Sequence, residues 1–76
     1  MTRDAIEKIE KMPRVKKTIE AYSILICRCR KIGLESDSKY KLKGYLQALE
    51  DTGIISGVEA RALLLYYSNK DWKEED

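Results

Sequence analysis

Apolar side chains recur along residues 13–32 at the spacing of one helix face. Five of them follow one another at steps of 4, 3, 4 and 3: Val15, Ile19, Tyr22, Ile26 and Cys29. This spacing keeps side chains on one side of an α-helix. We call these five residues the seam. The pattern predicts a single long helix with the seam toward the core, around which the rest of the chain is organised.

The middle of this helix also carries apolar residues outside the seam. Ala21, Ile24 and Leu25 lie on other sides of the helix, so its middle has to be covered from more than one direction. Two shorter helices cannot shield all of a longer one, and the same surface of a second copy is the simplest cover. The sequence therefore predicts a homodimer, or another partner, that contacts Ala21, Ile24 and Leu25. Trp72 follows the last helical pattern, and we expect it to be exposed or pressed against that partner.

Three further segments carry helical patterns. We predict helices over 3–12, 38–52 and 56–69 and a frayed acidic tail over 70–76. The apolar positions of 38–52 follow the i, i+3, i+4, i+7 spacing of an amphipathic helix. The segment 56–69 is apolar over most of its circumference. Periodicity there favours a core face made of Val58, Ala62, Leu65 and Tyr66, which Leu63, Leu64 and Tyr67 widen.

Helix-ending residues separate these segments. Proline is tolerated in the first turn of a helix and is costly in the interior, so Pro13 indicates a break or sharp kink rather than one straight helix of about 30 residues. Gly33 and Gly53 can take the left-handed conformation that ends a helix. The short link after Gly53 predicts that the last two helices are neighbours.

Polar residues mark where three of the helices begin. Thr2 is the expected cap of the first helix, and Ser36 or Asp37 that of the third. Ser56 and Glu59 have the spacing of a capping box, in which each side chain bonds the backbone of the other residue. The predicted fold is all-α: a small three- to four-helix domain with a long central helix packed against an antiparallel helical hairpin.

Size and charge bound what this domain can be. A chain of 76 residues forms one domain and buries only about 60% of its unfolded surface, so a second copy would help to stabilise it. The net charge is +2, but it is uneven: residues 1–34 hold nine Lys or Arg against four Asp or Glu, and residues 45–76 hold three against seven. The amino-terminal half is the basic half.

Little in the sequence points to catalysis or to a cofactor. There is no histidine, the commonest general base. Cys27 and Cys29 diverge on a helix, so they cannot form a disulfide with each other, and two thiols fall short of a zinc site. No signal-peptide core or apolar stretch of about 20 residues is present. We therefore expect a non-enzymatic cytoplasmic protein with reduced thiols and with no cofactor, metal or membrane contact.

Basic residues form a broken surface that suits a macromolecular partner. Four of them fall within about a third of the circumference of the long helix, and three at the start of the third helix extend this surface: Arg14, Lys17, Arg28 and Lys31, then Lys39, Lys41 and Lys43. Ala21 and Ile24 interrupt the basic sector at its middle. An apolar centre with basic ends suits the interface with a protein whose surface is acidic, and the alternative is direct contact with nucleic acid phosphates.

The sequence predicts a regulatory or inhibitory protein that acts by binding another protein. Small accessory proteins of phages and other mobile elements share these general properties, which is an expectation about a class of protein. The alternative is a DNA- or RNA-binding transcriptional regulator that uses the basic face of the long helix.

Overall fold

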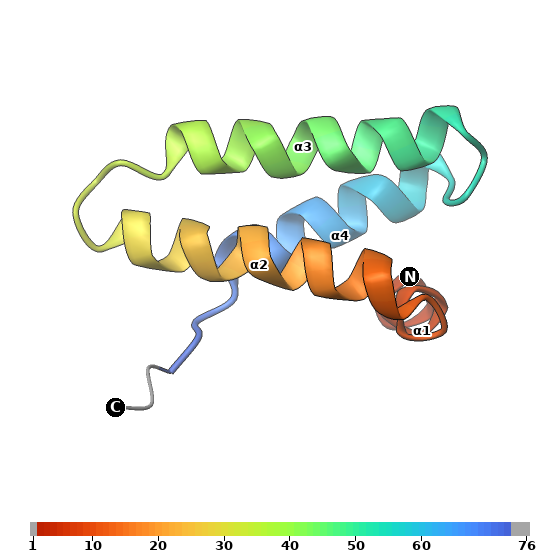
Figure 1. Cartoon of the computed structure of the whole chain (residues 1–76), viewed down its shortest axis with the longest axis horizontal. Coiled ribbons are helices and arrows are strands. Elements are labelled where there is room, and N and C mark those ends of the chain that lie inside the picture. The colour runs from red at the N-terminus through yellow and green to blue at the C-terminus, as the bar shows by residue number, and fades with distance from the viewer. Residues whose placement is uncertain (1, 74–76) are drawn as a thin grey trace.

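The computed structural model describes residues 2–73. Within them the chain is all-helical and contains no strand, as predicted. The helices are α1 (Thr2–Glu10), α2 (Pro13–Arg30), α3 (Ser36–Asp51) and α4 (Gly57–Asn69). Each boundary lies within two residues of the position expected from the sequence. α3 runs back alongside α2, and α4 returns next to both (Figure 1).

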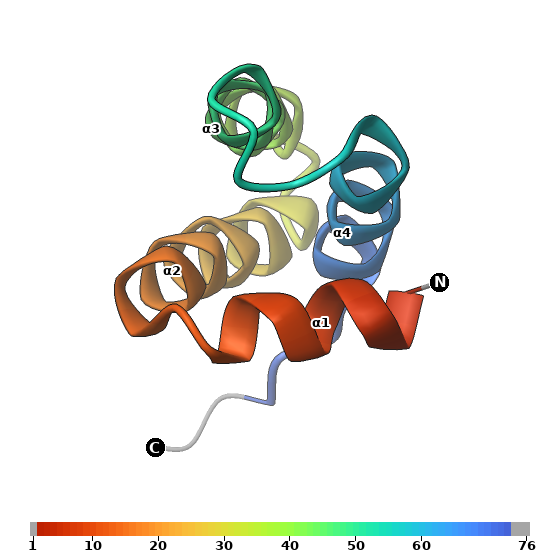
Figure 2. The same cartoon turned by 90° about the vertical axis from the view of Figure 1, so that its right-hand side faces the viewer.

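Pro13 separates α1 from α2 instead of kinking one helix. Met12 has φ −125° and ψ 82°, outside the helical region, and Pro13 follows it in the first turn of α2. There its missing N–H costs nothing, because the first N–H groups of a helix have no partner within the helix. The break lets α1 turn across the bundle, where it packs against α2 and α4 (Figure 2).

The glycine signals are confirmed at both turns. Gly33 has φ 74° and Gly53 has φ 79°. The next N–H in each turn reaches back to the helix, since Leu34 donates to the Cys29 carbonyl and Ile54 to the Leu49 carbonyl, both at 2.9 Å. These bonds satisfy carbonyls at the ends of α2 and α3.

Two of the three expected caps are wrong. Thr2 lies inside α1 rather than before it. The cap of α3 is Glu35, without a side-chain hydrogen bond, because the helical bonding starts with Lys39 N–H donating to the Glu35 carbonyl at 2.9 Å. Asp37 therefore lies in the first turn of α3, where a carboxylate offsets the helix dipole.

The capping box of α4 is confirmed. Glu59 N–H donates to Ser56 Oγ at 3.1 Å, and Ser56 N–H donates to Glu59 Oε1 at 2.8 Å. The same carboxylate oxygen accepts a hydrogen bond from Lys8 Nζ at 3.0 Å. A cap that is local to α4 thus also ties α1 to α4.

The core contains side chains from all four helices and from the link between α3 and α4. Its buried members are Ala5, Ile9, Ile19, Ile26, Leu42, Leu46, Leu49, Ile55, Ala60, Leu63 and Tyr67. The seam of α2 faces this core: Ile19 and Ile26 are fully buried, and Val15 and Tyr22 pack against it. The chain therefore covers most of the seam by itself, and Cys29 at its end is half-buried.

The predicted core face of α4 is wrong at its centre, although two of the residues expected to widen it are buried. Val58, Leu65 and Tyr66 are exposed, and the buried apolar residues of α4 are Ala60, Leu63 and Tyr67. Both sets follow helical spacing, so periodicity could not choose between them. Packing against α1, α2 and α3 selects the second set, and apolar side chains remain on the outer face of α4.

The first residues after α4 are anchored rather than frayed. Trp72 is half-buried against the core, and its Nε1 donates to Ser23 Oγ at 2.6 Å. Ser23 in turn donates to the Tyr67 carbonyl at 2.6 Å. Arg30 donates to the carbonyls of Ser68 and Lys70. The expectation of an exposed Trp72 is thus wrong, and residues 74–76 of the predicted tail lie outside the described residues.

Candidate binding groove between α3 and α4

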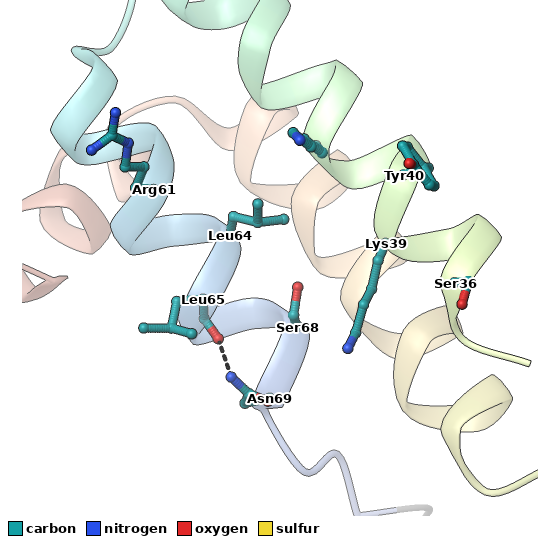
Figure 3. A pocket seen from close by; sticks show the side chains of 9 residues that line it. Ser36, Lys39, Tyr40, Arg61, Leu64, Leu65, Ser68 and Asn69 are labelled. Atoms are coloured by element: carbon teal, nitrogen blue, oxygen red, sulfur yellow. Dashed lines mark hydrogen bonds between the residues drawn. The ribbon is translucent and has the colours of Figure 1, made fainter. Parts of the chain in front are cut away.

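An open groove lies between the outer sides of α3 and α4. It has a volume of about 740 Å³ and is lined by Ser36, Lys39, Tyr40, Lys43, Arg61, Leu64, Leu65, Ser68 and Asn69. Figure 3 shows Leu64 pointing from α4 toward α3 and Lys39 extending along the gap from α3. We call this surface the α3–α4 groove.

A smaller depression of about 240 Å³ continues the groove toward the link between the two helices. It shares Lys43, Arg61 and Leu64 with the larger depression and adds Leu46, Gln47, Glu50, Gly57 and Ala60. The groove therefore follows α4 from its first to its last residue.

Both walls are built from one helical stripe each. On α3 the lining residues are 36, 39, 40 and 43, and on α4 they are 61, 64, 65 and 68, with Asn69 next to the last. These are i, i+3, i+4, i+7 sets, the positions that share one face of a helix. The core packing of α3 and α4 turns these two faces toward a common opening.

The larger depression is positively charged and has no carboxylate in its lining. Lys39, Lys43 and Arg61 carry its charges. Within residues 2–73, the salt bridges join other residues, Lys8 to Glu59 and Lys16 to Glu10. Within residues 2–73, three cations thus border the larger depression without a carboxylate in its lining, and Glu50 lines the smaller one beside Lys43 and Arg61.

Apolar surface lies between these cations. The side chain of Tyr40 is 73% exposed and that of Leu65 is 69% exposed, while Leu64 is half-buried and packs against the core. Large apolar side chains left in water cost free energy that a partner can recover by covering them. The combination of apolar surface and charged border resembles the anatomy of protein interfaces.

The structure divides the predicted basic surface in two. Lys39 and Lys43 line the groove, and Lys41 is exposed on α3 outside the lining. The other four, Arg14, Lys17, Arg28 and Lys31, lie on α2 or just after it and are exposed. The basic residues of α2 thus do not line the groove.

The predicted interface residues lie in two places, three of them on α2 and Trp72 against the core. Ala21 is exposed on α2, and Leu25 beside it is 41% exposed. Ile24 is half-buried. Trp72 packs on its own chain, and Lys70 Nζ lies 4.9 Å from its ring centroid.

The sequence did not single out Tyr40, Arg61, Leu64 and Leu65 as groove residues. The available signal was that 56–69 has more apolar positions than one helix face can bury. The sequence predicts that this surplus widens the core face. The structure places part of it, Leu64 and Leu65, along the groove.

Other reactive groups are held in structural roles. Burial is the main reason that the pKa of Tyr67 is raised to about 12, and the charge of Glu20 adds to the effect. Cys27 is buried, and neither it nor Cys29 forms a disulfide. Within residues 2–73, no group of three or more potential ligands could hold a metal ion, and no helix is long and apolar enough to cross a membrane.

Comparisons with protein-family models, curated protein sequences and solved structures found no match to this chain.

Proposed function

We propose that this chain is a non-catalytic regulatory or inhibitory protein that acts by holding an acidic segment of another protein in the α3–α4 groove. The observation that supports the proposal most is the lining of the larger depression. Lys39, Lys43 and Arg61 border exposed apolar surface there, and the lining of this depression contains no carboxylate. Complementary charge gives such an interface its specificity, and burial of the apolar surface gives it affinity.

The chemistry of the groove favours binding over catalysis. The larger depression offers amines, a guanidinium, hydroxyls and an amide, but neither a thiol nor a carboxylate. The groove is also open, so it does not exclude water from a reacting group as catalytic sites do. An inhibitor needs only to occupy a surface of its partner.

One observation favours nucleic acid as a second candidate partner. The ring of Tyr40 is exposed next to Lys39 and Lys41, and an aromatic ring among cations can stack on an unpaired base. Against this, Leu64 and Leu65 give much of the groove an apolar lining, and Glu50 stands at its far end. Nucleic acid surfaces favour more cations and fewer exposed leucines.

Panning a random peptide library against the immobilised protein tests the proposal. We expect wild type to select peptides that combine Asp or Glu with leucine-like residues. The double variant Lys43→Glu, Arg61→Glu should weaken the selected peptides by about tenfold or more, which corresponds to about 1.4 kcal/mol. Both substituted side chains lie at the groove surface.

The matched control is the double variant Lys17→Glu, Lys41→Glu, because it makes the same charge change at exposed sites outside the groove. It should bind the selected peptides like wild type. Selection of peptides without acidic residues, or equal loss in both variants, would overturn the proposal. Stronger binding of single-stranded nucleic acid than of any peptide, with a steep salt dependence, would favour the second candidate.

A further inference from the structure

We infer that the occupant of the α3–α4 groove is a single amphipathic helix that runs parallel to α4, with its acidic residues toward its carboxyl end. This inference rests on the proposed function and specifies the form and direction of the partner segment. Four features of the groove support it: its walls, its length, its charge polarity and its exposed apolar residues.

The walls of the groove suit a helix better than an extended strand. Both are helix faces, and each presents side chains at i, i+3, i+4 and i+7. The ridges of such faces accept the ridges of a third helix laid between them. A strand would instead need unpaired backbone groups at a sheet edge, and the described residues contain no strand.

The length of the groove sets the length of the occupant. Its lining runs along α4 from Gly57 to Asn69 and along α3 from Ser36 to Glu50. At the α-helical rise, these stretches span roughly 18 to 21 Å. A helix of about 14 residues, or four turns, covers this distance.

The charges of the groove differ between its two ends. Lys39 lies at the end that contains Ser68 and Asn69, and Lys43 and Arg61 follow toward the middle. The opposite end contains Glu50, whose Oε2 would lie 3.1 Å from a β-carbon placed on Gly57. Positive charge is therefore concentrated toward the Lys39 end of the groove, and the carboxylate of its lining lies at the other end.

This polarity fixes the direction of the occupant. A helix carries partial positive charge at its amino end and partial negative charge at its carboxyl end. Both ends are favoured when the amino end lies near Glu50 and the carboxyl end lies near Lys39. α4 runs from Gly57 to Asn69, so the occupant is parallel to α4. Its acidic side chains then face the three cations from its carboxyl half.

The exposed apolar residues determine which face of the occupant is buried. Leu64 lies between the walls, with Leu65 on α4 and Tyr40 on α3. A stripe of leucines at i, i+3, i+4 and i+7 on the occupant would cover them. The remaining face of the occupant stays in water and can have any polar composition.

The test uses two designed peptides of about 14 residues, long enough to span the groove. The first, the helical peptide, has that leucine stripe, glutamates confined to its carboxyl half and a hydrocarbon staple on its polar face. The second has the same sequence except for a proline at its centre, which breaks a helix, and it has no staple. Fluorescence anisotropy of labelled peptides measures both affinities. We expect the helical peptide to bind at least about tenfold more tightly, because the proline prevents a continuous helix from forming along the groove.

The direction is read from a nitroxide attached to either end of the helical peptide. On the amino end it should broaden the amide signals of Gln47 and Gly57, and on the carboxyl end those of Ser36 and Asn69. Leu65→Ser should weaken the helical peptide several-fold. Val58→Ser, on the same helix and outside the groove, should leave its affinity unchanged.

The outcomes separate this inference from the proposed function. Equal binding of the two peptides, or nitroxide broadening at the opposite ends, would overturn the helix or its direction and leave the acidic partner standing. Binding of neither peptide, or binding unaffected by Lys43→Glu and Leu65→Ser, would overturn the proposed function as well. Displacement of the helical peptide by single-stranded DNA at lower concentration than by unlabelled peptide would also overturn both.

Discussion

Ser23 explains why the residues after α4 lie against the bundle. It is fully buried in the middle of α2, where a serine would otherwise weaken the apolar core. Its hydroxyl accepts a hydrogen bond from the Trp72 indole and donates one to the Tyr67 carbonyl. One side chain thus connects α2, α4 and the segment that follows α4.

Replacement of Ser23 by alanine should destabilise the protein. The change leaves the Trp72 indole N–H and the Tyr67 carbonyl without this partner, and an unsatisfied buried polar group costs about 1–3 kcal/mol. Urea unfolding followed by fluorescence of Trp72, the single tryptophan, measures the loss. Ser36→Ala, at an exposed serine, should change stability little. Equal stability of wild type and Ser23→Ala would show that the two bonds contribute nothing.

Glu59 gives the protein a pH-dependent element of stability. The pKa of its carboxyl group is lowered from 4.5, first by the hydrogen bond from the Ser56 backbone and then by the bond from Lys8. A group whose pKa is lower in the folded state stabilises the protein at pH values above its pKa in the unfolded state. This stability is lost as pH falls below 4.5 and through the lower folded value.

The variant Glu59→Gln should therefore be less stable than wild type at neutral pH. Its glutamine can still accept the Ser56 bond, but it lacks the charge that pairs with Lys8. The difference between the urea midpoints of the two proteins should shrink as the pH falls from neutral to well below 4.5. A difference that stays constant over this range would contradict the role of the ionised carboxylate.

At the scale of the elements, local signals predicted the helices and packing chose their faces. Pro13, the glycine stops and the Ser56 capping box are local chemistry, so the sequence was sufficient to locate them. The outer face of α4 was not predictable in this way. Leu65 and Leu63 have the same chemistry, and contacts with three other helices decide which of them is buried.

In the candidate site too, the sequence predicted what depends on local chemistry and not what depends on packing. The sequence named Lys39 and Lys43 as binding residues from charge alone, and both line the groove. It could not bring Arg61 to them, because that juxtaposition depends on how α4 packs beside α3. The expected start of α3 is also wrong, because Ser36 and Asp37 favour a cap, whereas the helix begins at Ser36 with Glu35 as its cap.

Substitution by alanine at two exposed glycines should change the stability of the protein in opposite directions. Gly44 lies exposed within α3, and Gly53 has φ 79°; a β-carbon at either would meet nothing within 4 Å. Gly44→Ala should stabilise the protein by about 0.5–1 kcal/mol through helix propensity. Gly53→Ala should destabilise it by about 1 kcal/mol, because alanine is strained at positive φ. Thermal unfolding of both variants checks the signs, and a shift in the same direction would contradict this explanation.

At the scale of the whole molecule, the question is what remains for a partner once the chain has packed on itself. Most of the seam of α2 is covered by the chain itself. What α2 leaves exposed is a smaller patch at Ala21 and Leu25, with basic residues on either side along the helix. The α3–α4 groove combines more exposed apolar surface with concentrated charge, and for this reason we place the partner there.

The homodimer stays a prediction, and the structure specifies which exposed residues of α2 would form its interface. Two-fold pairing through Ala21 and Leu25 would bring the basic ends of two α2 helices close together. Sedimentation should then show a dimer that strengthens with added salt, which screens the repulsion. Leu25→Glu should be monomeric. A wild-type monomer at every salt concentration would contradict the homodimer and leave the groove proposal unaffected.

The most direct test of the groove as the binding surface is amide chemical-shift mapping of the labelled protein during titration with the stapled acidic helical peptide. We expect the largest changes at Lys39, Tyr40, Lys43, Arg61 and Leu65, with α1 and the outer side of α2 unchanged. The Lys43→Glu, Arg61→Glu variant should lose these changes, while Lys17→Glu, Lys41→Glu should keep them. Changes centred on Ala21 and Leu25 of α2, or no changes in the groove, would contradict the assignment.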